Sequence, residues 1–243
     1  MAGPGGTDRR LCEVWWAVST LRDADVRLLD DTEAARLSAL RRPADRARFT
    51  TAAALLRRAA AAAAGVEPAT VKVDRTCPDC GRPHGRPLLP GLDLYASVSH
   101  SGDRVAVATT HLGPLGVDVE EIAEVDTHGL GRLVLGSGER VETQRDFYVY
   151  WVRKESAVKA TGDGLRVPLA SVSVSPPGHP AELVSYPGNA SLASTMVDLE
   201  PGAGYVAALT VLSDRAPEVV QRWADGTGTT HPHRSDPRRS RPW

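Results

Sequence analysis

The predicted secondary structure runs through the same order twice, on either side of a break at Gly113 and Pro114. Helices are predicted from apolar faces and end signals at 30–40, 43–64 and 147–161. Strands are predicted from apolar, β-favouring runs at 11–19, 70–74, 94–99 and 104–110 before the break, and at 115–122, 171–175, 181–185, 194–199 and 204–212 after it. Between the early strands, residues 75–93 are rich in Pro, Gly and Cys and are predicted to be a loop.

This order favours an α+β fold made of two similar α+β subdomains, 9–112 and 113–214, related by a pseudo-twofold axis. The two halves share no obvious sequence identity. A cleft between two such units is the default position of a site.

The two ends of the chain have a different composition. Residues 1–8 and the tail 215–243, in which six Arg outnumber three acidic residues, are expected to be mostly disordered, the tail from about residue 224. Within that tail, Val219, Val220 and Trp223 are the few residues suited to a core. The formal net charge is −1, so nucleic acid is not an expected partner. The sequence shows no membrane-spanning run and no signal peptide, and the expected location is the cytoplasm.

The stretch GVDVE at 116–120 alternates between apolar and acidic residues. In a strand, Val117 and Val119 face the core while Asp118 and Glu120 share the other face. Two such carboxylates can share a hard cation such as Mg²⁺, which takes oxygen ligands and keeps water and phosphate in its shell. An edge strand with one solvated face would show the same alternation.

The stretch WVRKESAVK at 151–159 places three residues at helical spacing. Trp151, Glu155 and Lys159 follow one another by four residues and lie on one face of a helix. Glu155 could be a third metal ligand and Lys159 a phosphate contact. A solvated Glu–Lys pair, worth about 0.2–0.5 kcal/mol, is the structural alternative.

Taken together, these two motifs resemble those of the 4′-phosphopantetheinyl transferases, in particular the larger, pseudo-dimeric class that includes the surfactin synthetase activator. The spacing between GVDVE and WVRKESAVK is similar to the family's. The resemblance covers roughly residues 30–212. It also includes the stretches GRP at 85–87, YASVSHSGDRVAVA at 95–108, GDGLRVPLASVSV at 162–174 and PGAGYVAALTV at 201–211.

The resemblance implies transfer of the phosphopantetheine arm of coenzyme A to a serine of a carrier protein, with release of adenosine 3′,5′-bisphosphate. It implies Asp118, Glu120 and Glu155 as ligands of Mg²⁺, with Mn²⁺ as an alternative that oxygen ligands do not exclude. Asp118, Glu155 and Lys159 are the implied catalytic residues. Glu155 would accept the serine proton, directly or through a metal-bound water, and Lys159 would stabilise the departing phosphate oxygens.

The resemblance also implies a set of coenzyme A contacts. These are Lys159, Ser99, His100, Arg86, Arg48, Arg41 and Arg36. Without this context, a histidine in a strand–turn is more often structural. For the arginines, the alternative is an amphipathic helix with solvated charges. Expected partners are acyl or peptidyl carrier domains, such as those of peptide and polyketide synthases, and a monomer is expected because one chain supplies both halves.

Two stretches depart from this picture. Residues 129–140 carry leucines where the family has aromatic residues, and Ser137 could cap a helix that begins at Gly138. The motif CPDCGRPH at 77–84 offers two cysteines and a histidine, with Cys12 as a distant fourth ligand. A turn with reduced thiols is favoured over zinc, because four ligands are not in evidence. A different metal-dependent phosphoryl hydrolase and a catalytically inactive binding module are the competing functions.

Overall fold

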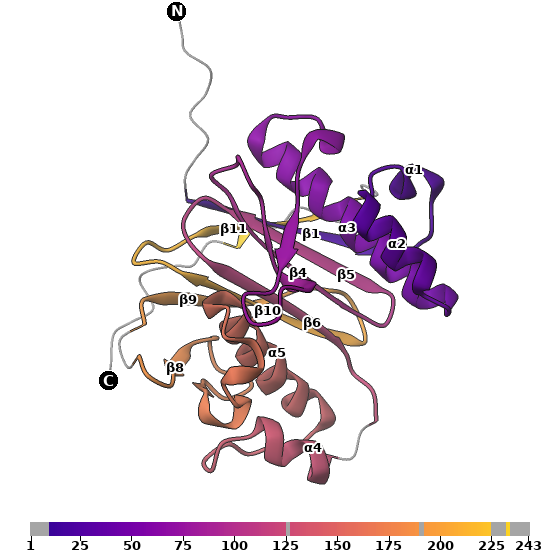
Figure 1. The fold of residues 1–243 in the computed structure, drawn as a ribbon. Helices are drawn as coiled ribbons and strands as arrows, with labels where there is room; N and C mark the ends of the chain where they lie inside the picture. The colour runs from indigo at the N-terminus through magenta and orange to yellow at the C-terminus, as the bar shows by residue number, and fades with distance from the viewer. Residues whose placement is uncertain (1–9, 125–126, 190–191, 225–231, 234–243) are drawn as a thin grey trace, which may run out of the picture.

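A five-stranded sheet forms the centre of the N-terminal half (Figure 1). In this computed structural model, residues 10–124, 127–189, 192–224 and 232–233 are described. The strand order is β12 (Pro232–His233), β11 (Glu218–Trp223), β1 (Leu11–Val18), β5 (Arg104–Thr110), β4 (Tyr95–Ser101). Only the β1–β11 pair is parallel within this sheet.

Strand β11 lies in the tail 215–243 but ends before residue 224, from which disorder is expected, and no strand was predicted at 218–223. Val219 is buried, and Trp223 packs against the same core as Trp16 of β1. Strand β11 pairs with β1 of the N-terminal sheet, although it comes after both predicted subdomains, 9–112 and 113–214. The other expectations of disorder, at 1–8 and in the rest of the tail, fall largely outside the described residues.

A second sheet of three antiparallel strands forms the centre of the C-terminal half. Its order is β6 (Leu115–Glu121), β10 (Tyr205–Leu212), β9 (Ser194–Leu199). The two halves share a pairing order. In the N-terminal half β5 lies between β1 and β4, and in the C-terminal half β10 lies between β6 and β9. The mixed α+β class is therefore as predicted.

The two sheets pack face to face between two long helices (Figure 1). Residues of β1 and β5 share one core with residues of β6 and β10. Helix α3 (Pro43–Ala64) covers the outer face of the N-terminal sheet, and α5 (Gln144–Thr161) packs on β6 and β10. No helix in the described part of the chain is both long enough and apolar enough to cross a membrane.

The helix ends follow the sequence signals. Helix α2 (Asp31–Ala39) begins with a capping box formed by Asp30 and Glu33. Helix α3 has proline at its first turn and ends at Gly65, which has φ of 68°. Helix α5 begins at Gln144, three residues before the predicted start, because Thr143 and Asp146 form a second capping box.

Several short elements differ from the predictions. Residues 68–70 form a 3₁₀ turn, η1 (Pro68–Thr70), and the strand predicted at 70–74 begins only at β2 (Asp74–Thr76). Strand β2 pairs with β3 (Pro83–Leu88), so the predicted loop 75–93 contains a hairpin. The strands at 171–175 and 181–185 are shorter: β7 (Ser173–Val174) and β8 (Leu183–Ser185).

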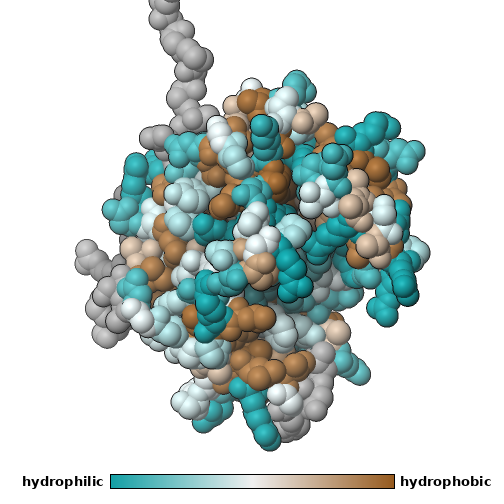
Figure 2. Space-filling model, viewed as in Figure 1, coloured by the Kyte–Doolittle hydropathy of each residue, from teal (hydrophilic) through white to brown (hydrophobic). Residues whose placement is uncertain are grey.

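Ser137 does not cap a helix beginning at Gly138, which the sequence allowed. Helix α4 (Thr127–Val134) comes earlier, and the N–H of Gly136 donates to the Glu139 carboxylate in the turn that follows. The remaining short elements are α1 (Asp23–Val26), η2 (Gly164–Arg166) and η3 (Leu169–Ser171). Figure 2 shows hydrophobic residues gathered on the lower part of this face, where α4, α5 and the segment after α5 lie. Leu133 of α4 and Leu165 of η2 are exposed.

Candidate active site

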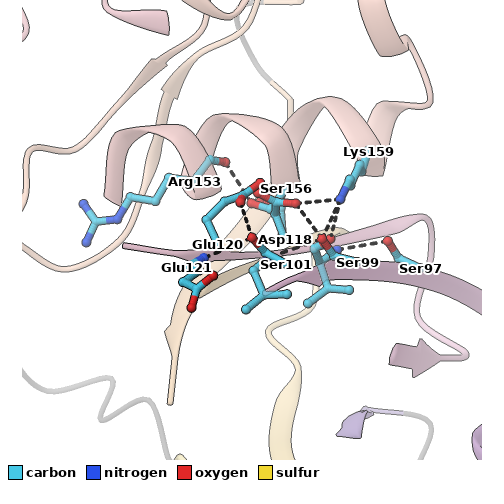
Figure 3. A network of polar contacts seen from close by, with 12 residues as sticks. Ser97, Ser99, Ser101, Asp118, Glu120, Glu121, Arg153, Ser156 and Lys159 are labelled. Atoms are coloured by element: carbon cyan, nitrogen blue, oxygen red, sulfur yellow. Dashed lines mark hydrogen bonds and ion pairs between the residues drawn. The ribbon is translucent and has the colours of Figure 1, made fainter. Parts of the chain in front are cut away.

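A row of serine side chains joins the two halves beside the candidate site. Ser97, Ser99 and Ser101 alternate along β4, so their side chains share one face. Their hydroxyl oxygens accept the N–H groups of Val117, Val119 and Glu121 on β6, at 3.0, 3.3 and 3.1 Å. These bonds hold β4 against β6, although the two strands belong to different sheets (Figure 3). The SVSHS stretch thus has a structural role that sequence reasoning did not find.

Asp118 lies at the centre of this junction. Its side chain is 4% exposed, and its Oδ1 accepts hydrogen bonds from the Ser99 hydroxyl at 2.8 Å and the Lys159 ammonium at 2.6 Å. Its Oδ2 is buried and has no hydrogen-bond partner among the described residues. A buried carboxylate oxygen without a donor is costly, and a cation would satisfy it.

Lys159 reaches this carboxylate from α5 (Figure 3). Its ammonium group also donates to the Ser99 hydroxyl at 3.1 Å and the Val117 carbonyl at 3.2 Å. The predicted helical face is confirmed, because Trp151, Glu155 and Lys159 all line one cavity.

The helix can approach β6 so closely because residue 116 is glycine. A Cβ atom at Gly116 would lie 2.0 Å from the carbonyl oxygen of Ser156 and 2.6 Å from the backbone nitrogen of Ala160. The Ser156 hydroxyl is hydrogen-bonded to Thr210 of β10 at 2.7 Å, which holds the helix in this position. The glycine of the GVDVE stretch therefore sets the distance between Lys159 and Asp118.

Glu120 and Glu155 complete the acidic group. Burial, and secondly the Asp118 charge, raise the pKa of Glu120 to about 7. The same two causes raise the pKa of Glu155. Glu120 accepts a hydrogen bond from the Ser101 hydroxyl at 2.6 Å. Crowded carboxylates of this kind are relieved by a bound cation.

The three carboxylates face one cavity, yet they are not drawn together into a closed ligand set. Among the described residues, the group whose ligand atoms all lie within 4.8 Å of one another is a different one, Cys77, Cys80 and His84. Lys159 occupies the Oδ1 side of Asp118 and leaves Oδ2 open. The donor set, all carboxylate oxygen with one buried oxygen unpartnered, fits a hard divalent ion such as Mg²⁺.

The cavity that these residues line has a volume of about 530 Å³ and belongs to both halves. Its C-terminal wall is formed by Asp118, Glu120 and the exposed face of α5. Its N-terminal wall comes from α2, α3, β4 and the β2–β3 hairpin. A volume of this size suits a cofactor-sized ligand.

Four of the predicted coenzyme A contacts, Ser99, His100, Arg36 and Lys159, line this cavity. Desolvation by the surrounding protein lowers the pKa of His100, and the charges of Arg48, Lys159 and Arg36 lower it further. These effects favour the neutral form of the imidazole. The guanidinium of Arg36 lies over the ring of Phe49, 5.2 Å from its centre.

Three other predicted contacts lie elsewhere. Arg48 lines an adjoining depression with Arg36 and His100, where it pairs with Asp45 at 2.5 Å. Arg86 donates to the Ala160 carbonyl at 3.3 Å, and it lines a separate cavity next to Leu115. Arg41 is exposed and lines none of these cavities.

Arg75 is a site residue that the sequence did not suggest. It lies on β2 in a stretch that was predicted to be a loop, and its side chain lines the cavity. Burial lowers its pKa, while the charge of Glu33 raises it. No motif surrounds it, so only the hairpin that places it beside Arg36 could have revealed it.

The chain is similar to known proteins of one family. The family model of the 4′-phosphopantetheinyl transferase superfamily matches residues 114–210, the part that carries β6 and α5. The 4′-phosphopantetheinyl transferase HetI of Nostoc sp. is 30% identical over 207 residues, which cover 79% of this chain and 82% of HetI. The chain belongs to the 4′-phosphopantetheinyl transferase superfamily.

Other relatives match over shorter stretches. The transferase Sfp of Bacillus subtilis is 32% identical over 99 residues, covering 37% of this chain and 44% of Sfp. The transferase gsp of Aneurinibacillus migulanus is 28% identical over 129 residues, covering 50% of this chain and 53% of gsp. The protein is thus an enzyme of the phosphopantetheinyl transferase type, as predicted.

Proposed function

We propose that this transferase moves the 4′-phosphopantetheine arm of coenzyme A to a serine hydroxyl of a carrier protein and releases adenosine 3′,5′-bisphosphate. The observation that carries the proposal is the convergence of Asp118, Glu120, Glu155 and Lys159 on one cavity. That cavity is also lined by the imidazole of His100 and the guanidinium groups of Arg36 and Arg75. Carboxylates for a metal, an ammonium and anion-binding groups are what attack on a pyrophosphate requires.

Asp118, Glu120 and Glu155 hold the metal in this proposal, with the unpartnered Oδ2 of Asp118 as the leading ligand atom. When bound, Mg²⁺ neutralises charge on the pyrophosphate oxygens. Arg36, Arg75 and His100 bind the phosphates of coenzyme A on the opposite wall.

In the chemical step, the serine oxygen forms a bond to the β-phosphorus of coenzyme A. The bond between that phosphorus and the bridging oxygen breaks, and its electron pair leaves with adenosine 3′,5′-bisphosphate. Glu155 accepts the serine proton, and the Lys159 ammonium stabilises the departing oxygen. Ser99 keeps the Lys159 ammonium in place through their 3.1 Å hydrogen bond.

We propose further that a pseudo-twofold axis relates the two halves, and that one chain is active by itself. The shared pairing order β1–β5–β4 and β6–β10–β9 supports the relation. Both walls of the cavity come from one chain, which supports a monomer. Light scattering during chromatography tests this, and an activity that falls on dilution together with a dimer mass would contradict it.

Single substitutions test the assignment. Asp118→Asn and Glu155→Gln should each lower transfer by at least about 10²-fold. Glu182→Gln is the matched control, because Glu182 is exposed and does not line the cavity. Lys159→Met should lower kcat more than it raises KM for coenzyme A. Wild-type turnover in the Glu155 variant, or a change confined to KM in the Lys159 variant, would remove that residue from the chemistry.

A further inference from the structure

The β2–β3 hairpin carries three metal-ligating side chains that the transfer site does not use. The sulfur atoms of Cys77 and Cys80 and a ring nitrogen of His84 all lie within 4.8 Å of one another. The Cys80 sulfur is 2.9 Å from Nε2 of His84. All three cysteines of the chain, Cys12 among them, are free thiols.

The backbone brings these side chains together without a disulfide. The N–H of Cys77 donates to the Arg82 carbonyl at 2.9 Å, and the N–H of Gly81 donates to the Cys77 carbonyl at 2.8 Å. Gly81 has φ of 69°, a left-handed conformation that glycine adopts without strain. The turn therefore closes on itself and directs both thiols to the side on which His84 lies.

We propose that Cys77, Cys80 and His84 bind a zinc ion, with solvent as the fourth ligand. Zinc prefers tetrahedral sites of thiolate sulfur and imidazole nitrogen, and thiolates select it over the ions that carboxylates hold. Cys80 and His84 are exposed, so solvent can reach the remaining position. Cys12 is 0% exposed in the core between the sheets and is excluded as a ligand.

The zinc ion fixes the shape of the turn of the β2–β3 hairpin. Its strands are short, and its turn touches the C-terminal half through an exposed ion pair between Asp79 and Arg166. Such exposed pairs contribute little to stability. Arg75 of the same hairpin lines the transfer cavity, so the ion also positions that guanidinium. This last effect rests on the proposed function, whereas the zinc site itself does not.

Metal analysis of the full-length protein tests the site directly. The chain is produced with zinc in the medium, purified under reducing conditions and analysed by mass spectrometry of the elements. We expect one zinc ion per chain in the wild type and in His179→Ala, a control that removes an exposed histidine from another loop. Cys80→Ser and His84→Ala should lose most of the zinc.

Cobalt(II) substitution distinguishes this site from the carboxylates. A thiolate-bound cobalt ion gives a sulfur-to-metal charge-transfer band, which carboxylate ligands cannot produce. The band should appear in the wild type and in Asp118→Asn, and it should be absent in Cys80→Ser. Circular dichroism checks that each variant is folded.

Two results would overturn the proposal: wild-type protein that contains no zinc and gives no such band although its thiols are reduced, or a folded Cys80→Ser variant that keeps its zinc. Neither result depends on transfer activity. If zinc is found, its removal by a zinc-selective chelator in excess Mg²⁺ should raise KM for coenzyme A more than it lowers kcat.

Discussion

Replacing Gly116 by alanine should separate α5 from β6 and thereby separate the two groups that the chemistry needs. The added Cβ atom would lie 2.0 Å from the Ser156 carbonyl oxygen, whereas real Cβ contacts essentially never fall below 3.0 Å. The helix must therefore move away by about 1 Å, and the Lys159 ammonium, now 2.6 Å from Asp118, moves with it.

A displacement of this size has a large effect on rate and a moderate one on stability. A misplacement of about 1 Å can cost on the order of 10²-fold in rate. Overpacking of a tight interior contact costs about 1–3 kcal/mol in the free energy of unfolding. Gly116→Ala should therefore remain folded at low temperature while transfer falls by about 10²-fold.

The assay measures transfer to an apo carrier protein alongside chemical denaturation. Gly138→Ala is the matched control, because a Cβ atom there meets nothing within 4 Å and no positive φ is involved. That variant should keep wild-type rate and stability. If Gly116→Ala transfers at the wild-type rate, the close approach of α5 to β6 does not position the catalytic residues, and the reasoning is refuted.

Three further predictions concern ionisable side chains. Lys154 is 0% exposed and pairs with Glu139 at 2.5 Å. Lys154→Met would leave the Glu139 charge without its partner and should lower the free energy of unfolding by about 3–5 kcal/mol. An unchanged denaturation midpoint would contradict this. The pKa of His100 in the folded protein lies below 6.5, so the unfolded chain binds this proton more readily. The free energy of unfolding should therefore fall as the pH drops through 6.5. NMR titration of the imidazole should show the lowered pKa. Burial raises the pKa of Cys12 to about 12, so iodoacetamide at pH 8 should leave this thiol unmodified in the folded protein.

The convergence of Asp118, Glu120, Glu155 and Lys159 on one cavity could be predicted because its signals are local. The alternation of GVDVE fixes which side of β6 carries Asp118 and Glu120, and helical spacing puts Glu155 and Lys159 on one face. Both patterns are properties of a single element, so they do not depend on how distant parts of the chain meet.

The remaining features depend on such distant contacts. Strand β11 forms because it can add in parallel to β1, more than 200 residues earlier in the chain, and its own sequence shows only a few apolar residues. Arg75 enters the cavity only when the hairpin folds. Arg86 has the expected motif, yet its side chain turns to the Ala160 carbonyl, away from the transfer cavity. The pairing of Lys159 with Asp118 likewise needs both elements in place.

The most direct test of the account is the intact mass of an apo carrier protein after incubation with this enzyme, coenzyme A and Mg²⁺. Peptidyl and acyl carrier domains are compared, each beside a variant whose acceptor serine is alanine. We expect a gain of one phosphopantetheine that needs both the serine and the metal. An unchanged mass on every carrier, under conditions in which coenzyme A binds, would contradict it.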